Sequence, residues 1–150
     1  MNDLLQPAGS NIPSQNENSR RLFYALQKLM WRDVGVLRGT EKLQRALNEV
    51  RRFRDDMFPS IRPKQGMAFN TSLMDWLDLR NSLLCAEAIC LAASERKESR
   101  GAHQMEDIPF KSDKFTKNQI ISGHNGHLVS SWKAVQKLDF DLKEKSLAVV

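Results

Sequence analysis

The sequence predicts an all-α fold: an up-down-up three-helix bundle, followed by an irregular tail with a short β-hairpin. Three segments carry apolar residues at steps of three and four, the spacing of one helix face. Short connections separate these segments, which favours antiparallel packing of neighbouring helices. After Gly101 the helical spacing stops, and an Asn-Gly pair between two apolar stretches indicates a hairpin.

We expect three regions along the chain. Residues 1–18 are rich in Asn, Gln, Ser and Pro and read as a linker-like tail. Residues 19–101 form the three-helix bundle. Residues 102–150 hold an exit loop, a β-hairpin near 119–130 and a C-terminal tail.

The composition is that of one soluble domain, with 150 residues, 41% of them hydrophobic and 27% charged. The net charge of +5 is dispersed, so no nucleic-acid interface is expected. The longest nearly apolar run, 83–93, is shorter than the roughly 20 residues that cross a bilayer. No secretory signal is visible at the start. We therefore expect a cytoplasmic protein that does not span a membrane, with any attachment to the inner face of a membrane made through partners.

The first helix is expected to begin at Ser19, a suitable N-cap, and to end within 31–34, before the turn bracketed by Gly35 and Gly39. Trp31 and, further along the chain, Trp76 occupy apolar helical positions and are expected in the core. The stripe of this helix contains Leu22, Phe23, Leu26, Leu29 and Met30.

The second helix is expected to start at Thr40 as N-cap, with Glu41 at the positive end of the helix dipole, and to stop at Pro59. Its apolar residues continue at helical steps through Leu43, Ala46, Leu47, Val50, Phe53 and Met57.

The third and longest helix is expected from about Thr71 to Arg100, a segment without Pro or Gly. Two adjacent apolar stripes give it a face wide enough to pack against two neighbours. Gly101 supplies a residue that can turn left-handed just past the helix end. The first stripe is Trp76, Leu79, Leu83, Ala86, Cys90 and Ala93, and the second is Leu73, Leu77, Leu84, Ala88 and Leu91.

The hairpin prediction depends on the segment His124-Asn125-Gly126-His127, which is flanked by Ile120-Ile121 and Leu128-Val129. Asn-Gly is the preferred pair for a type I′ turn. Because an isolated hairpin is only marginally stable, we expect it to lie on the bundle or on a partner.

The sequence offers no catalytic, cofactor-binding or metal-binding residue. The histidines beside the predicted turn have no third ligand at metal-like spacing. Cys85 and Cys90 are five residues apart on one helix, so they are interpreted as two buried, unpaired thiols. Nucleophile-elbow and glycine-rich phosphate-binding patterns are absent from the sequence.

One polar cluster exceeds what a helix end requires, and it consists of Arg96, Glu98, Ser99, Arg100, Gly101 and His103. Arginine offers a rigid fork of donors, and the other members add a carboxylate, a hydroxyl and a titratable ring. Two interpretations stay open at this point. The cluster is either a structural cap or a surface that docks onto a second polar surface.

Three motifs, in order along 19–110, resemble the C-terminal helical domain of the succinate dehydrogenase and fumarate reductase flavoprotein family, which also includes L-aspartate oxidase. Met30-Trp31 with Val34-Gly35-Val36 and Arg38 resembles the family's first helix end and turn. The segment 77–87 resembles the start of its long helix, and 96–103 with Asp107 and Pro109 resembles its helix end and exit loop. Met105 departs from the arginine that is common there, and Phe115 falls near a common tryptophan.

The resemblance implies a parent oxidoreductase whose FAD lies in a Rossmann-type domain upstream of the part that this chain resembles. Nothing here matches that domain, so no FAD site and no residue of the chemical step are expected on this chain. The expected partner is the FAD/capping domain or subunit, contacted through the cluster and Arg38. The alternative is a flavin-free helical adaptor that binds another protein.

Overall fold

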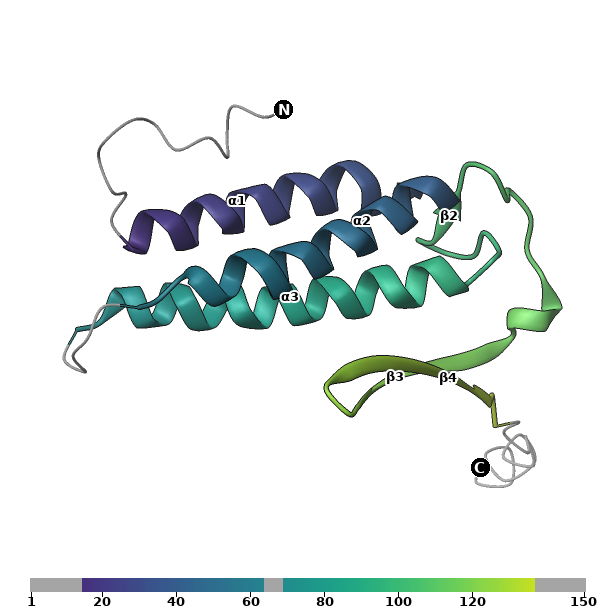
Figure 1. Cartoon of the computed structure of the whole chain (residues 1–150). Coiled ribbons are helices and arrows are strands. Elements are labelled where there is room, and N and C mark those ends of the chain that lie inside the picture. The colour runs from purple at the N-terminus through teal and green to yellow at the C-terminus, as the bar shows by residue number, and fades with distance from the viewer. Residues whose placement is uncertain (1–14, 64–68, 137–150) are drawn as a thin grey trace, which may run out of the picture.

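The computed structural model describes residues 15–63 and 69–136. Three long helices lie side by side in this part of the chain, and a hairpin lies beneath one of them (Figure 1). The helices are α1 (Gln15–Val34), α2 (Thr40–Arg52) and α3 (Thr71–Glu95), with short turns η1 (Phe53–Met57), η2 (Phe58–Ser60) and η3 (Asp113–Phe115). The strands are β1 (Leu37–Arg38), β2 (Gln104–Met105), β3 (Lys117–His124) and β4 (His127–Ala134).

The predicted all-α bundle with a hairpin in its tail is confirmed. α3 contacts both α1 and α2, as its wide apolar face predicted. The core lies between the three helices and contains the expected stripes, among them Leu22, Leu26, Leu29, Leu43, Ala46, Leu47, Val50, Phe53, Leu79, Leu83, Ala86, Cys90 and Ala93.

Helix boundaries differ from the sequence prediction at four points. The α-helical geometry of α2 ends at Arg52, before the expected Pro59, and the chain continues through the π-helical turn η1 and the 3-10 turn η2. α1 begins at Gln15, and Ser19 lies buried inside it. The N-terminus of α2 is capped by a residue from another segment, because the backbone N–H of Thr40 donates to Asp107 Oδ2 at 3.1 Å. α3 ends at Glu95, where the backbone of Arg96 becomes extended. The last two differences arise from contacts with a distant loop that helical spacing does not reveal.

Two residues expected in the core are exposed. Trp31 is 85% exposed, and the Cys85 thiol is also at the surface, while Cys90 is buried. Burial raises the pKa of the Cys90 thiol to about 12. Trp76 is half-buried as an anchor, since its ring stacks on Phe58 and its Nε1 donates to the Ile61 carbonyl at 3.0 Å.

Two buried carboxylates tie the helices together, and the sequence analysis missed both. Asp33 accepts from Arg32 of its own helix and from Arg45 of α2. The hydrogen bond from Arg32 in particular lowers the pKa of Asp33 to about 2. Glu87 of α3 is likewise held by two arginines, Arg51 and Arg54. The signal available in the sequence was an acidic residue inside an otherwise apolar helix segment.

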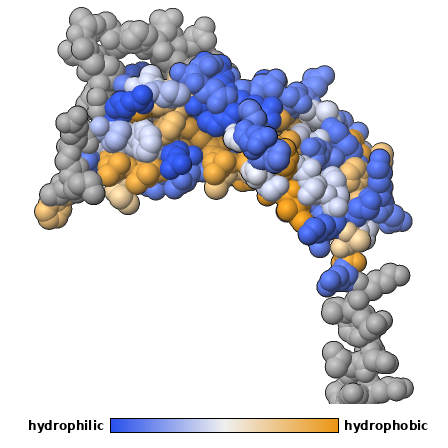
Figure 2. All heavy atoms as spheres, turned by 60° about the horizontal axis from the view of Figure 1, so that its bottom comes forward, coloured by the Kyte–Doolittle hydropathy of each residue, from blue (hydrophilic) through white to orange (hydrophobic). Residues whose placement is uncertain are grey.

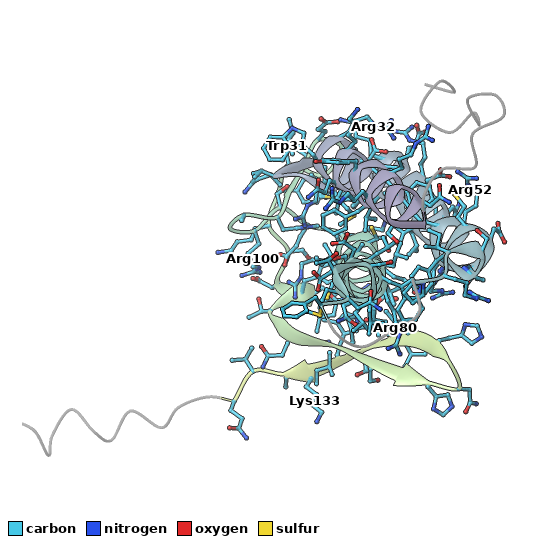
Figure 3. All side chains as sticks on the ribbon, turned by 90° about the vertical axis from the view of Figure 1, so that its left-hand side faces the viewer. Trp31, Arg32, Arg52, Arg80, Arg100 and Lys133 are labelled. Atoms are coloured by element: carbon cyan, nitrogen blue, oxygen red, sulfur yellow. The ribbon has the colours of Figure 1, made fainter. Side chains whose placement is uncertain are left out.

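The hairpin has the predicted turn but longer strands. Asn125 and Gly126 have φ values of 49° and 80°, as a type I′ turn requires. β3 pairs with β4 from Lys117↔Ala134 to His124↔His127. The hairpin lies against α3 (Figure 3). Gln119 Nε2 donates to Glu95 Oε2 at 3.4 Å.

Replacing Gly126 with alanine is expected to destabilise the hairpin by about 1 kcal/mol, because a Cβ disfavours the left-handed backbone. No atom lies within 4 Å of the added Cβ, so the effect is conformational and not steric. Amide hydrogen exchange of β3 and β4 measures it. Gly123→Ala is the matched control, because that site is equally open and lacks a positive φ. Equal exchange in both variants would contradict the turn assignment.

Candidate functional site

The polar cluster lies where the chain leaves α3 and reverses. Its backbone forms a tight turn in which Arg100 and His103 exchange two backbone hydrogen bonds of 2.8 and 3.0 Å. Gly101 sits in that turn with φ of 58°. The prediction that Gly101 directly follows the helix end is therefore wrong, since the helix stops five residues before Arg100. The extended backbone at Arg96 makes this reversal possible.

Glu98 is the centre of the cluster and is fully buried. Its Oε1 accepts from Arg96 at 2.7 Å and from Arg100 at 2.8 Å, and its Oε2 accepts from the Ser112 backbone N–H at 3.0 Å. The bond from Arg100, supported by Ser112 and Arg96, lowers the pKa of Glu98 to about 2 despite the opposing effect of burial. The carboxylate is thus held ionised inside the protein.

His103 connects the cluster to the turn between α1 and α2. Arg38 donates to its Nδ1 at 2.8 Å, so Nδ1 accepts and Nε2 carries the proton that is donated to the Arg96 carbonyl at 2.9 Å. Burial, together with the positive charges of Arg38 and Arg96, lowers the pKa of His103. The ring is therefore held neutral, in one tautomer.

Arg38 reaches His103 because two distant segments pair. β1 and β2 form a short parallel ladder in which Arg38 lies opposite Met105. The Glu106 backbone N–H donates to the Arg38 carbonyl at 2.7 Å, and Arg38 Nε donates to the Gly35 carbonyl at 2.8 Å. All seven sequence-predicted residues therefore belong to one connected region.

Ser99 and the two arginines fasten the exit loop, residues 102–116. Ser99 Oγ accepts from the Met105 N–H at 2.8 Å and donates to the Ile108 carbonyl at 2.7 Å. Arg96 donates to the carbonyls of Phe115 and Lys117, and Arg100 to Ser112 and Thr116. Arg96 also lies 5.0 Å from the centre of the Trp132 ring. The cluster thus locks the loop and the hairpin onto the bundle.

The two departures from the family pattern lie in this loop. Met105, at the common arginine position, is buried in the core. Phe115, near the common tryptophan, packs against Trp132 with ring centres 5.4 Å apart. Both residues therefore support the loop from within.

Part of the cluster still reaches the surface. A depression of about 340 Å³ is lined by cluster and hairpin residues, namely Arg96, Arg100, His103, Phe115, Thr116, Lys117 and Val135. Arg96 and Arg100 keep 18% and 30% of their side chains exposed, while Glu98 has none. The exposed rim is therefore basic, and the buried carboxylate of Glu98 lies beneath it.

Protonation of His103 is expected to destabilise the protein. Its folded pKa is below the ordinary 6.5, so its contribution to stability is present above about pH 6.5 and is lost as the pH falls below that value. His103→Gln, which keeps an acceptor and a donor, should flatten the pH dependence of the urea midpoint in this range. His127→Gln, at the exposed hairpin turn, is the matched control for the substitution itself. Equal slopes for wild type and His103→Gln would contradict the buried, neutral ring.

Two helix N-termini in the described part of the chain are occupied by the chain's own side chains. The N-termini of α2 and α3, which would otherwise attract phosphates, are closed by Asp107 and by the Asn70 side chain. The depression beside the cluster is at the small end for organic ligands, about 300 to 1,000 Å³. Within 15–63 and 69–136, no group of three His, Cys, Asp or Glu residues could hold a metal ion. No helix among these residues is both long and apolar enough to cross a bilayer.

Comparison with known proteins gives consistent matches. A family model described as fumarate reductase flavoprotein C-term matches residues 24–147. The chain is 33% identical, over 118 residues, to the 8-methylmenaquinol:fumarate reductase flavoprotein subunit of Wolinella succinogenes, covering 77% of this chain and 19% of that protein. It is 26% identical, over 116 residues, to the succinate dehydrogenase flavoprotein subunit of Coxiella burnetii, covering 77% of this chain and 20% of that protein.

Solved structures give the same result. FrdA of E. coli quinol fumarate reductase superposes with a TM-score of 0.74 at 25% identity, covering 92% of this chain and 23% of that one. The chain thus spans about a fifth of the length of the curated relatives that it matches.

Proposed function

The chain belongs to the fumarate reductase flavoprotein C-terminal family, and from this premise we propose that it braces the FAD and capping domains of a flavoprotein oxidoreductase. The remaining four-fifths of such a protein would bind the flavin and carry out the chemical step on its dicarboxylate substrate. This chain would contribute a rigid surface and no reacting group. The family match weighs against the alternative, a flavin-free helical adaptor.

The proposed contact is the Arg96–His103 cluster together with Arg38. Arg96, Arg100 and His103 line the basic depression, and Gly101 is exposed beside it. Glu98 and Ser99 would act from beneath, because their polar atoms already hold the arginines and the exit loop. A docking surface fixed in this way loses little side-chain freedom on binding.

Such bracing has a physical use in catalysis. Flavin and substrate must be held within a fraction of an ångström of their productive geometry, and a displacement of about 1 Å can cost about 100-fold in rate. A bundle whose exit loop is fixed by Glu98 can keep neighbouring domains in position. We also propose that the protein is cytoplasmic, and that any attachment to a membrane is made by its partners.

Arg100→Ala is expected to weaken docking by about 30-fold or more, because it removes a partly desolvated guanidinium from the contact. The assay supplies this chain in trans to the Wolinella flavoprotein subunit that lacks its matching segment. Co-elution of flavin absorbance with the chain is then measured. The relative's own segment, supplied in trans, is the reference.

Lys97→Ala is the matched control, since Lys97 is exposed in the same segment. Circular dichroism establishes that each variant is folded. Docking unchanged by Arg100→Ala would refute the role of the cluster, and no association of the unsubstituted chain would refute the proposed function.

A further inference from the structure

The side of α3 that faces away from the bundle is largely apolar, as is usual for a buried helix face. Solvent-facing sides of surface helices are normally polar. The side of α3 that points away from α1 and α2 is instead formed mainly by apolar residues, with Asn81 among them and the exposed Asp78 and Arg80 at its edges. The apolar residues are Met74, Leu77, Leu84, Cys85, Ala88, Ile89 and Ala92. Figure 2, turned toward this side, shows apolar side chains gathered there.

Four of these apolar residues are exposed, and Leu77, Ala88 and Ala92 are half-buried. Met74 is 59% exposed, Leu84 52% and Ile89 46%, and the Cys85 thiol lies between them at the surface. Both strands of the hairpin contact α3 and run beneath its C-terminal half, which leaves the N-terminal half open (Figure 1). Within the described residues, no helix or strand therefore fully covers the second apolar stripe that the sequence predicted.

We infer that this outward α3 face is a second docking surface, covered by the flavin-binding part of the parent protein. The inference builds on the proposed function. A helix that is largely apolar on its outward side as well as on its core side is typical of the centre of a larger protein. The relatives supply that larger body, because about four-fifths of their length lies outside the region matched here.

The chemistry of the face defines its occupant. An aliphatic strip with the Asn81 amide at its centre, and with the charged groups of Asp78 and Arg80 at its edges, fits an apolar surface that presents polar groups opposite these three side chains. The face is distinct from the basic depression beside Arg100, which lies at the other end of the helix. The flavin-binding part could therefore be held at two separated places. Two contacts prevent it from rotating against the bundle as well as from dissociating.

The reactivity of the Cys85 thiol shows whether this face is covered, and its measurement requires no substitution. The test uses a chimera, the full-length Wolinella flavoprotein subunit with its matching segment replaced by this chain. N-ethylmaleimide labelling of the tryptic peptide 81–96 is followed by mass spectrometry, which separates Cys85 from Cys90. In the chain alone Cys85 should react fast. In the chimera its labelling should be slower by about tenfold or more, since access then requires opening of the docked body.

The outcomes separate the two proposals. A chimera that retains FAD while Cys85 stays as reactive as in the free chain would overturn the inference and leave the proposed function standing. A chimera that folds without flavin would refute both. Leu84→Asp should reduce the flavin content of the chimera severalfold without unfolding the free chain. Tyr24→Asp, an exposed site on α1, should not. Equal losses from both variants would also overturn the inference.

Discussion

Replacing Glu98 with alanine is expected to lower the free energy of unfolding by about 3 to 5 kcal/mol, which is the cost of removing one partner from a buried ion pair. Arg96 and Arg100 would both lose their buried carboxylate, and the Ser112 N–H would lose its acceptor. Because both arginines are partly exposed and can recover water, the lower end of the range is the better expectation.

Urea denaturation followed by circular dichroism measures this change. Glu95→Ala is the control, because that carboxylate sits at the same helix end but is exposed and accepts only a long bond of 3.4 Å from Gln119 among the described residues. Its effect should stay within about 0.5 kcal/mol. A small effect of Glu98→Ala would show that the exit loop is held by other contacts.

The same residue predicts an acid-sensitive fold. The pKa of Glu98 is lowered from 4.5 to about 2, so its stabilisation is complete above about pH 4.5 and is lost as the pH falls toward 2. The full difference corresponds to about 3 kcal/mol. The free energies of unfolding of wild type and Glu98→Gln should therefore become similar as the pH falls toward 2.

Leu83→Ala is expected to cost about 2 to 5 kcal/mol, because it leaves a cavity at the contact of α3 with its two neighbours. Leu84→Ala at the next position should change the stability of the free chain by less than about 0.5 kcal/mol, because that side chain is half exposed. The pair differs only in the direction of the side chain from the helix axis. Thermal unfolding of the two variants measures both values, and similar costs would mean that α3 packs in another orientation.

The sequence was most informative where the contacts are local. Helical spacing identified the three helices and their buried stripes, and the Asn125-Gly126 pair identified the hairpin turn. Trp31 was placed in the core because it follows an apolar stripe, although α1 turns that position outward. Periodicity near a helix end cannot distinguish the last buried position from the first exposed one.

The candidate site was recognised as a cluster but not as a network. Glu98 and the arginines were grouped because they are neighbours in sequence, whereas their partners Ser112 and Phe115 lie more than a dozen residues away. The pairing of β1 with β2, which brings Arg38 to His103, has no local signal at all. Buried ion pairs are therefore evident in the sequence only as charges in unexpected places.

The bond from Thr40 to Asp107 also affects how the polypeptide is made. The residue that completes the start of α2 is synthesised 67 positions later. During translation, α1 and α2 can emerge from the ribosome and form helices. The first turn of α2 stays frayed until the exit loop follows. The start of α2 is thus completed only after the exit loop has been made, and a ribosome stalled before Asp107 would display a domain whose α2 is frayed and sensitive to proteases.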